Sequence, residues 1–228
     1  MISHAYKALI ANKLKTFLII ISLIFSIVSI FLISSISNGV ISMYSSMLKS
    51  NGDIIITQAK ISDTFFSNVD INLIKEIEYL KNINEAGAMT VGASPVEKLP
   101  IVAIYGVTQN RFKNYKLEKG KYPLNNEVIV GKSIFEQLSN RNEVQIANKT
   151  FKISGVFESE IGFENGGIVL NISDAGEIFN KSASIILVNT ALNSDIEEII
   201  KEIKTLSKDI DVKSTQNFVD NYNQFKII

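Results

Sequence analysis

The chain of 228 residues contains no cysteine, no tryptophan and a single histidine, His4. Without cysteine it has no disulfide bonds, thiolate metal sites or cysteine nucleophiles. One histidine cannot form a histidine-rich metal site, and His4 precedes the long apolar segment, so no Ser-His-Asp triad is expected in the folded part. These absences exclude many classes of enzyme, and no metal or other cofactor is predicted.

A surplus of one charge is also missing, because 23 basic residues balance 23 acidic ones. No large block of one sign indicates binding to nucleic acid or to an acidic polymer. The length is typical of one or two domains. The positions of the apolar residues are therefore more informative than the overall composition.

One long uncharged run extends over residues 16–48. Within it, residues 17–36 are mainly isoleucine, leucine, phenylalanine and valine, and about 20 such residues can cross the roughly 30 Å hydrocarbon layer as a helix. We predict a transmembrane helix over residues 17–36, which can extend to about residue 48. The alternatives are a cleaved signal peptide, with a cleavage-like sequence at residues 34–37, and a buried core helix of a soluble protein.

Basic residues flank only the N-terminal side of this run. Lys7, Lys13 and Lys15 precede it, whereas the far flank carries no charge before Lys49. The positive-inside rule therefore predicts a cytoplasmic N-terminus and a periplasmic or extracellular location for the bulk of the chain. Apolar residues at helical spacing among the lysines predict a cytoplasmic interfacial helix over residues 1–16, and a disordered basic flank is the alternative.

Three serines lie on one side of the predicted span. Ser22, Ser26 and Ser29 stand at i, i+4 and i+7, so they form a stripe of small, weakly polar side chains. Such a stripe favours helix packing against a span of another copy or another protein, although serines are also tolerated on lipid-facing surfaces.

Two strand-helix-strand patterns follow at opposite ends of the remaining chain. Asp70 is the expected N-cap of the first helix, and Ser194 with Glu197 forms a capping box that opens the second. The strand candidates are residues 53–57, 86–93 and 101–107 in the first pattern and residues 184–188 and 210–212 in the second. We predict an α+β fold in which residues 49–107 and 183–213 form a split βαβ, ferredoxin-like subdomain.

The region between these patterns, residues 108–182, is richer in turns and short strands. Its strand candidates are residues 127–130, 144–146, 150–157 and 167–170, with one small helix around Phe135. This pattern predicts that residues 108–182 form an inserted, mainly β subdomain. At the C-terminus, Phe218, Tyr222 and Phe225 recur at helical spacing, so residues 214–228 are expected to start a stalk helix toward a missing second span. Fraying of a natural terminus is the alternative.

Several short motifs are too weak to define a site. The Gly-Lys-Ser sequence at residues 131–133 copies the end of a P-loop. However, Asn126 stands where the P-loop motif has its first glycine, and the intervening residues predict a strand. Glu158, Glu160 and Glu164 suggest a weak cation site, and a solvated acidic loop explains them better. Three N-x-[ST] triplets begin at residues 148, 171 and 180, and such triplets arise by chance in a chain rich in asparagine and serine.

Four segments resemble MacB-like and FtsX-like ABC transporter permeases. Residues 8–18 (ALIANKLKTFL) are similar to the segment that leads into the first span of that family. Residues 117–121 (LEKGK), 128–131 (VIVG) and 151–156 (FKISGV) are similar to recurring segments of its periplasmic core domain. Each segment is degenerate alone, and the resemblance depends on their order and spacing over nearly the whole chain.

Two features depart from this family. The glycines common in its first span are replaced by isoleucine, leucine and serine, and the three spans expected after the periplasmic domain are missing. The second departure is explained most simply if the chain is a fragment or a truncated gene product.

The resemblance implies a membrane subunit, or permease, of an ABC-type export or extraction system in the bacterial inner membrane. Such a subunit performs no chemistry itself, because a separate cytoplasmic ATPase drives the movement of the periplasmic domains. The implied partners are that ATPase, a second permease subunit in a homo- or heterodimer, membrane lipid, and a membrane-fusion or outer-membrane component. The alternative is a signal-anchored extracytoplasmic ligand-binding or sensor domain, and a periplasmic enzyme is a more distant one.

Overall fold

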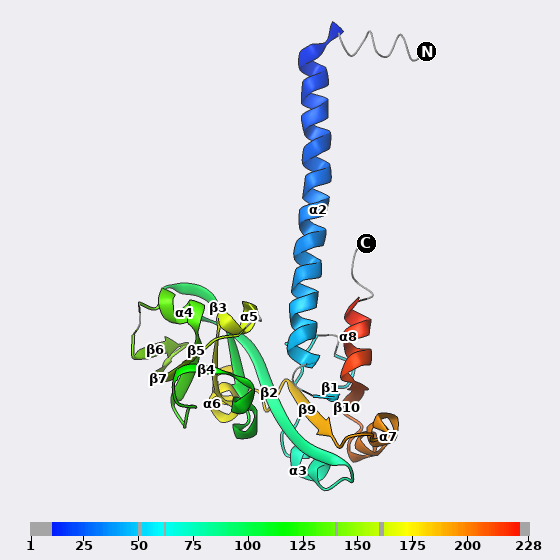
Figure 1. Cartoon of the computed structure of the whole chain (residues 1–228), viewed down its shortest axis with the longest axis vertical. Coiled ribbons are helices and arrows are strands. Elements are labelled where there is room, and N and C mark those ends of the chain that lie inside the picture. Colours follow the sequence, from blue (N-terminus) through cyan, green and yellow to red (C-terminus); the bar gives the residue numbers. More distant parts are fainter. Residues whose placement is uncertain (1–10, 50–51, 62, 140, 160–161, 224–228) are drawn as a thin grey trace. The chain divides into compact units, whose positions relative to one another are not determined.

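The computed structural model describes residues 11–49, 52–61, 63–139, 141–159 and 162–223 (Figure 1). Contacts divide the chain into two units, with boundaries after Ser42 and after Asn221. The expected interfacial helix lies largely outside the described residues, as does the last residue of the C-terminal apolar stripe, Phe225.

One long helix dominates the N-terminal unit. Helix α2 (Lys13–Lys49) has 37 residues and is about 55 Å long at 1.5 Å per residue. Among the described residues, its Lys13–Ser42 stretch is the one helix long and apolar enough to cross a membrane. Leu14 is 73% and Phe25 74% exposed. A core helix of a soluble protein would bury such side chains, so their exposure disfavours that alternative.

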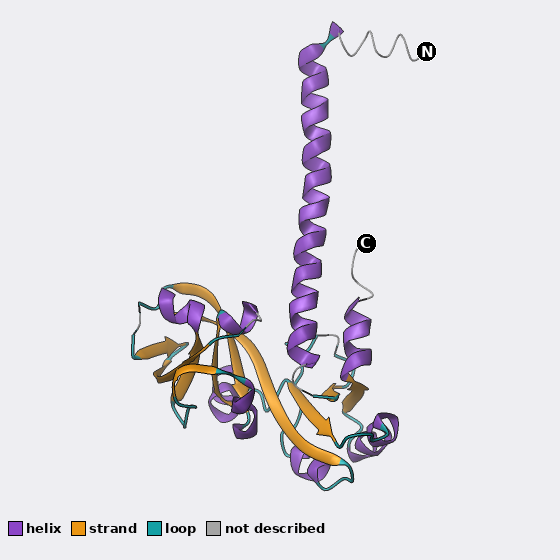
Figure 2. Ribbon diagram, viewed as in Figure 1, coloured by secondary structure: helices purple, strands orange, loops and turns teal. Residues whose placement is uncertain are grey.

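The second unit is built on one ten-stranded sheet (Figure 2). The strand order is β10-β1-β9-β2-β3-β8-β5-β7-β4, and β6 lies beside β7. Two hydrophobic cores form on this sheet. We call the part around β10, β1, β9 and the first half of β2 the first lobe, and the part from the second half of β2 to β4 the second lobe.

The first lobe has a split βαβ arrangement. It contains β1 (Ile54–Gln58), α3 (Leu73–Glu78), β2 (Ile83–Val96), β9 (Ile185–Thr190), α7 (Ile196–Leu206) and β10 (Ile210–Ser214). Strand β1 lies between β10 and β9, β2 lies beyond β9, and all three pairs are antiparallel. Each βαβ unit therefore places its own two strands on either side of one strand from the other unit. The predicted α+β, ferredoxin-like fold is confirmed.

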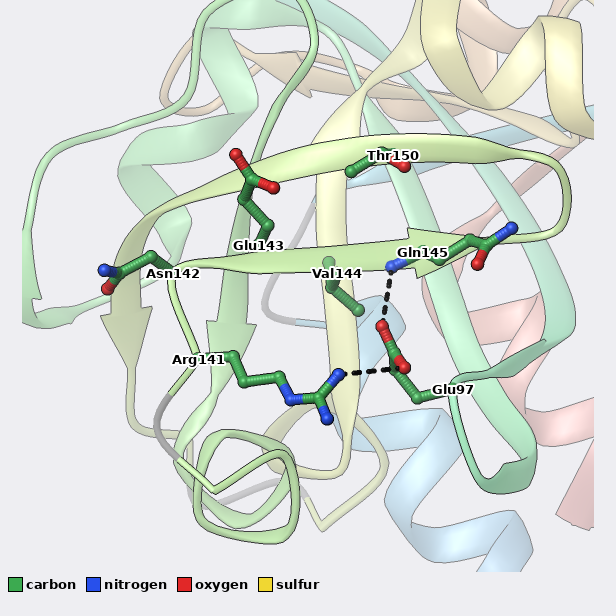
Figure 3. Close-up of a pocket in the computed structure, with 7 residues that line it drawn as sticks. All are labelled: Glu97, Arg141, Asn142, Glu143, Val144, Gln145 and Thr150. Carbon is green, nitrogen blue, oxygen red and sulfur yellow. Dashed lines mark hydrogen bonds and ion pairs between the residues drawn. The ribbon is translucent and has the colours of Figure 1, made fainter.

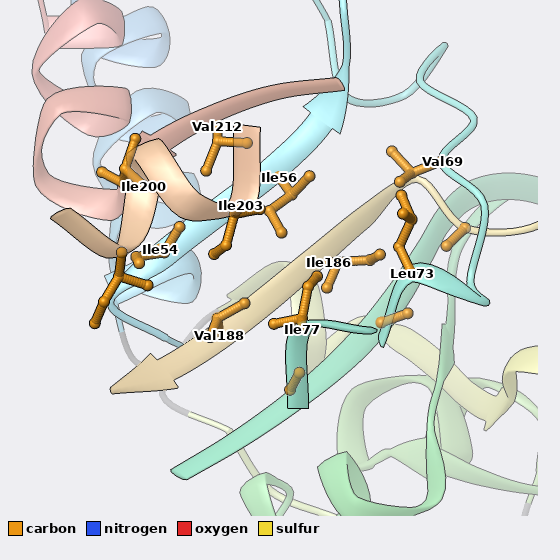
Figure 4. Close-up of a cluster of buried hydrophobic side chains, with 14 of the residues drawn as sticks. Ile54, Ile56, Val69, Leu73, Ile77, Ile186, Val188, Ile200, Ile203 and Val212 are labelled. Atoms are coloured by element: carbon orange, nitrogen blue, oxygen red, sulfur yellow. The ribbon is translucent and has the colours of Figure 1, made fainter. Parts of the chain in front are cut away.

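Aliphatic side chains fill the space between this sheet and its two helices (Figure 4). Alternate residues of a strand point to the same face, so Ile54 and Ile56 of β1 and Ile186 of β9 share the helical side. Helix α7 contributes Ile203, which is 0% exposed. The core is therefore formed by the apolar faces of the helices and the alternate apolar residues of the strands.

Two predicted helix caps are wrong. Asp195, rather than Ser194, caps α7, because its carboxylate accepts hydrogen bonds from the backbone amides of Glu197 (3.0 Å) and Glu198 (3.2 Å). The Ser194 hydroxyl instead donates to the carbonyl of Ala191. Asp70 accepts from the amide of Asn72 at 2.9 Å within a turn, and α3 begins only at Leu73. In both places a local side-chain turn competes with the expected cap.

The second lobe is mainly β, as predicted, but it also contains the strand over residues 101–107, which the sequence pattern assigns to the first subdomain. Its strands are β3 (Leu99–Val107), β4 (Leu117–Gly120), β5 (Glu127–Gly131), β6 (Glu143–Ile146), β7 (Lys149–Phe157) and β8 (Gly167–Asn171). The pairs β3·β8 and β5·β7 are parallel, and the other described pairs of this lobe are antiparallel. Its helical segments are η1 (Gln109–Asn114), α4 (Lys132–Gln137), α5 (Gly162–Asn165) and α6 (Ile172–Phe179).

Helix α6 was not expected from the sequence. Asn171 ends β8 and caps α6 through its side-chain oxygen, which accepts from the amide of Ser173 at 3.1 Å. Gly106 of β3 lets the helix approach, since a Cβ added there would lie 2.1 Å from the Cβ of Ala175. A last helix, α8 (Thr215–Asn223), follows β10 directly and buries Phe218 and Val219.

Candidate functional site

The chain enters and leaves the first lobe on two adjacent strands. Strand β1 starts a few residues after helix α2, and β10 leads directly into helix α8. Ile54 of β1 pairs with Ser214 of β10 in the antiparallel register. A displacement of either connection is therefore delivered to the same edge of the sheet.

Four residues, Gly52, Asp53, Thr190 and Thr215, join these connections, and we call them the connection clamp. The amide of Thr215 donates to the carbonyl of Asp53 at 2.8 Å, and the Thr215 hydroxyl donates to the carbonyl of Gly52 at 2.7 Å. The Asp53 carboxylate accepts from the amide of Thr190 at 2.8 Å and from its hydroxyl at 3.0 Å. Residues far apart in sequence thus fasten the segment before β1 to the end of β9 and to the start of α8.

Burial strengthens the clamp. Thr215 is 3% exposed, so its hydroxyl and the carbonyl it bonds are shielded from competing water. Gly52 is also buried, and a Cβ at this position would lie 3.1 Å from the carbonyl oxygen of Val188. The close approach of the chain to β9 therefore favours a residue without a side chain.

A second set of contacts joins the two lobes. Segment η1 follows β3 and lies on β2. There the side-chain Nδ2 of Asn110 donates to the carbonyl of Ala86 at 2.8 Å, and the Thr108 hydroxyl accepts from the backbone amide of Ala88 at 3.1 Å. Lys113 forms an ion pair with Glu85 at 2.6 Å. We call this segment with the β2 residues beneath it the interlobe joint.

Arg111 is the central residue of the joint. It is 2% exposed, and its guanidinium donates to the carbonyl of Leu187 in β9 at 2.8 Å. Burial lowers the pKa of Arg111, and the charge of Glu85 acts in the opposite direction. Gly87 makes room for this side chain, because a Cβ there would lie 2.6 Å from the Arg111 Nε.

Other buried polar groups lie in the second lobe near the joint. Glu164 is 7% exposed and accepts a hydrogen bond from the Ser159 hydroxyl at 2.7 Å. Burial raises the pKa of Glu164, while the Ser159 bond acts to lower it. Burial, with the charge of Glu164, also raises the pKa values of Tyr105 and Tyr115. These phenols therefore stay neutral and act as packing groups.

The clamp and the joint differ from a metal site in composition. Among the described residues, no group of three or more histidine, cysteine, aspartate or glutamate side chains could hold a metal ion. The clamp and the joint instead consist of hydrogen bonds and ion pairs between backbone segments. Such contacts hold the joined strands at fixed positions relative to one another.

The weak sequence motifs have structural roles. Lys132 lies 3.3 Å from the carboxylate of Glu118 and 3.5 Å from that of Glu158, and these acids would repel a phosphate. Glu164 is buried and accepts a hydrogen bond from Ser159, so the expectation of a solvated acidic loop is wrong for it, and Glu160 lies outside the described residues. In the triplets, Asn171 caps α6 and Asn180 ends it in a left-handed conformation.

The three serines of α2 each bond within their own helix. The hydroxyls of Ser22, Ser26 and Ser29 donate to the carbonyls four residues earlier, at 2.8, 2.9 and 2.7 Å respectively. Their donors are thus already used, and small size is what they offer a neighbouring helix. Their proposed role in helix packing stays a prediction.

Sequence reasoning missed the clamp and the joint. The sequence pattern places Asp53 at the start of a strand, and nothing in it distinguishes Arg111 from the other charged residues. The signals present were local: Gly87 inside a strand pattern indicates a close approach of another group, and Thr215 stands where a strand changes to a helix. Neither signal indicates which residue makes the contact.

Comparison with known proteins identifies the family. The MacB-like periplasmic core domain family matches residues 16–206. No curated protein sequence matches the chain.

Two solved structures share the fold. The periplasmic region of MacB from Actinobacillus actinomycetemcomitans has a TM-score of 0.62 at 13% identity, over 77% of this chain and 95% of that chain. The extracellular domain of the noncanonic ABC-type transporter YknZ from Gram-positive bacteria has a TM-score of 0.60 at 11% identity, over 71% of this chain and 100% of that one. An apolar N-terminal helix before such a domain fits a membrane-anchored periplasmic domain. The family match covers most of the sequence, and the chain therefore belongs to the MacB-like periplasmic core domain family, a domain of ABC-type transporter proteins.

Proposed function

We propose that this chain is a membrane subunit, or permease, of an ABC-type export or extraction system. In this proposal a separate ATPase hydrolyses ATP in the cytoplasm, and the permease converts that reaction into movement of its periplasmic domain. The observation that carries the proposal is the connection clamp, which ties both connections of a MacB-like domain to adjacent strands β1 and β10.

The clamp and the joint suggest how movement passes through the domain. A shift of helix α2 would reach β1, and the clamp would carry it to β10 without fraying either strand. The sheet continues from β1 through β9 to β2, and the interlobe joint holds the second lobe on β2 and β9. We propose that the two lobes move as one body.

We also propose an inner-membrane location with the N-terminus in the cytoplasm. Lys13 and Lys15 stand at the N-terminal end of α2, and the side chains that follow them are apolar and exposed. Because the chain has no cysteine, one introduced cysteine reports one position. In intact cells, a membrane-impermeant maleimide should label Leu192→Cys, which replaces a side chain 92% exposed, and should leave Lys15→Cys unlabelled until the cells are opened. The reverse pattern would contradict the orientation.

The partners in this proposal are the cytoplasmic ATPase and a second permease subunit in a homo- or heterodimer. A membrane-fusion or outer-membrane component is a third candidate. Helix α2 would pack against partner spans through Ser22, Ser26 and Ser29, since small side chains let helices approach closely in lipid.

The test is purification of the tagged full chain from membranes of its own host in mild detergent. We expect a P-loop ATPase to copurify in a fixed ratio and the complex to hydrolyse ATP. A matched preparation, in which the tag is carried by an unrelated single-span protein, controls for contamination. A chain that purifies without an ATPase and binds a small ligand saturably would contradict the proposal and favour the sensor alternative.

The serine stripe gives a separate prediction. Leucines at Ser22 and Ser26 should lower the yield of the complex because they widen the packing face, while the periplasmic domain stays folded. The matched control is leucine at Gly39, where a Cβ would meet no atom of the described residues within 4 Å beyond the adjacent backbone of its own helix. The yield is measured by size-exclusion chromatography in detergent, and an unchanged yield for the serine variant would remove the packing role.

A further inference from the structure

The outer edge of strand β6 is largely unpaired. Strand β6 pairs with β7 along its whole length, from Glu143 to Ile146, but it pairs with β2 only at Val96. Beyond Val96 the chain turns away through Glu97, which has a φ of 51°, and returns as β3. No described strand therefore occupies the position beside residues 143–145.

Backbone groups point into this vacant position. The carbonyl of Asn142 accepts from the amide of Ile153 in β7 at 2.8 Å, so residues at even positions face β7. Successive backbone groups of a strand alternate in direction, and the amides of Glu143 and Gln145 therefore face outward. The amide of Gln145 donates to the side-chain carboxylate of Glu97 at 3.4 Å.

A groove of about 570 Å³ lies along this edge. Figure 3 shows the side chains of Glu97 and Arg141 in it, beside the strand and joined by an ion pair of 3.1 Å. The charged residues that line the groove are two acids, Glu97 and Glu143, and one base, Arg141. The groove thus presents the outward backbone groups of Glu143 and, behind the Glu97 carboxylate, the amide of Gln145. Because Arg141 pairs with Glu97, the charged side chains that line it carry one net negative charge.

We propose that the edge of β6 accepts an extended, lysine- or arginine-containing segment of a partner polypeptide as an additional strand. The segment continues the line of β2 and lies antiparallel to β6. One of its carbonyls replaces the Glu97 carboxylate as the acceptor for the Gln145 amide. Backbone pairing provides the affinity, and Glu143, the acid of the groove that Arg141 does not pair, selects a basic segment.

The Glu97 contact covers part of the edge when no partner is bound. Exposed strand edges invite pairing with other chains, and charged side chains across the edge are a common protection. Glu97 is held by Arg141 and covers one amide through a long hydrogen bond, so a peptide carbonyl can displace it. This inference stands independently of the proposed transport function.

Two proline variants test the inference. Gln145→Pro removes the amide that the incoming strand needs, and it leaves the β6–β7 ladder intact because that amide faces outward. Glu143→Pro removes the second outward amide. Gln145→Ala is the matched control, since it changes the side chain and keeps the amide.

The probe is a random library of seven-residue peptides, selected against the full chain in detergent micelles. Peptides that are recovered are then titrated by fluorescence anisotropy against the wild type and each variant. We expect basic peptides that bind the wild type and Gln145→Ala within twofold of each other and bind both proline variants at least about tenfold more weakly. Recovery of no peptide, or equal binding to the wild type and the proline variants, would overturn the proposal.

Hydrogen exchange on the wild-type chain gives a readout that needs no variant. The amides of Glu143 and Gln145 should exchange more slowly when a selected peptide is bound, and unchanged exchange would overturn the proposal. A dimer of the chain that Gln145→Pro dissociates would also overturn it, because a second copy would then be the occupant of the edge.

Discussion

The first lobe packs aliphatic side chains between a sheet and two amphipathic helices, whereas the second lobe brings backbone segments together at glycines. In the first lobe, Ile54, Ile186 and Ile203 are 0% exposed, and the core is isoleucine, valine, leucine and alanine. In the second lobe, a Cβ at Gly106 or Gly131 would collide with α6 or α5 at 2.1–2.2 Å. Both lobes have a buried hydrophobic core, and the second lobe depends in addition on close approach at these two glycines.

The roles that we propose for the two lobes also differ. The first lobe carries the connection clamp, where movement would enter the domain. The second lobe carries the open edge of β6, where we place a partner. Stability changes in the two lobes should therefore differ in cause and size, and the interlobe joint should decide whether they unfold together.

The largest effect is expected from Ile203→Ala in the first lobe. Removing a fully buried isoleucine leaves a cavity and should lower the free energy of unfolding by about 2–5 kcal/mol. The measurement is urea unfolding of the full chain in micelles, with hydrogen exchange reporting each lobe. The control is Ile101→Ala, at a side chain 77% exposed, which should change stability by less than about 0.5 kcal/mol. Loss of structure in the first lobe alone would show that the joint does not couple the lobes.

Gly106→Ala should have a smaller but clear effect in the second lobe. The added methyl group would push α6 away from β3, and overpacking of this kind costs about 1–3 kcal/mol. Thermal unfolding followed by circular dichroism measures it. Gly39→Ala is the matched substitution in an open position, and equal midpoints for the two variants would argue against close packing at Gly106.

Loss of one clamp hydrogen bond should cost less again. Thr215→Val keeps the shape of the side chain and removes the donor to the Gly52 carbonyl, which should destabilise the domain by about 1–2 kcal/mol. Thr205→Val is the control, because the Thr205 hydroxyl bonds only within an exposed turn of α7. Chemical unfolding compares the two, and a larger loss for Thr205→Val would contradict the clamp.

The smallest effect concerns pH. Burial raises the pKa of Glu164 in the folded state, so the folded chain binds more protons than the unfolded chain just above the ordinary value of 4.5. The contribution of this group to stability is therefore present below that pH and is lost as pH rises through the folded pKa. Glu164→Gln should flatten this decline and stabilise the domain at pH 7. Unfolding curves at several pH values measure it, and an unchanged pH dependence would contradict the assignment.

Local periodicity made the first lobe predictable. Its helices show apolar residues such as Ile199 and Ile203 on one face, and its strands are short apolar runs between turn residues. The family segments in the second lobe, including residues 128–131 and 151–156, also fell on strands β5 and β7. These features could be predicted because each depends on residues that are close together in the sequence.

The missed features depend on distant partners. Helix α6 begins with an isoleucine directly after a buried strand, and only the space above Gly106 shows why a helix fits there. The N-cap of α3 lies two residues beyond the expected one because Asp70 bonds within a turn, and the cap of α7 is Asp195 because the Ser194 hydroxyl bonds back to Ala191. Arg111 became a joint residue through contacts with Leu187 and Gly87, which no spacing in the sequence indicates.

Distances in the complex with its ATPase test the central claim most directly. Because the chain has no cysteine, spin labels can be attached at introduced cysteines alone. Labels at Val40→Cys and Ile101→Cys measure the distance between the helix and the second lobe, and labels at Leu192→Cys and Ile101→Cys measure the distance between the two lobes. We predict that trapping the ATPase with a nucleotide analogue shifts the first distance distribution and leaves the second unchanged, because the domain moves as one body. Two unchanged distributions, or a change between the lobes, would contradict this mechanism.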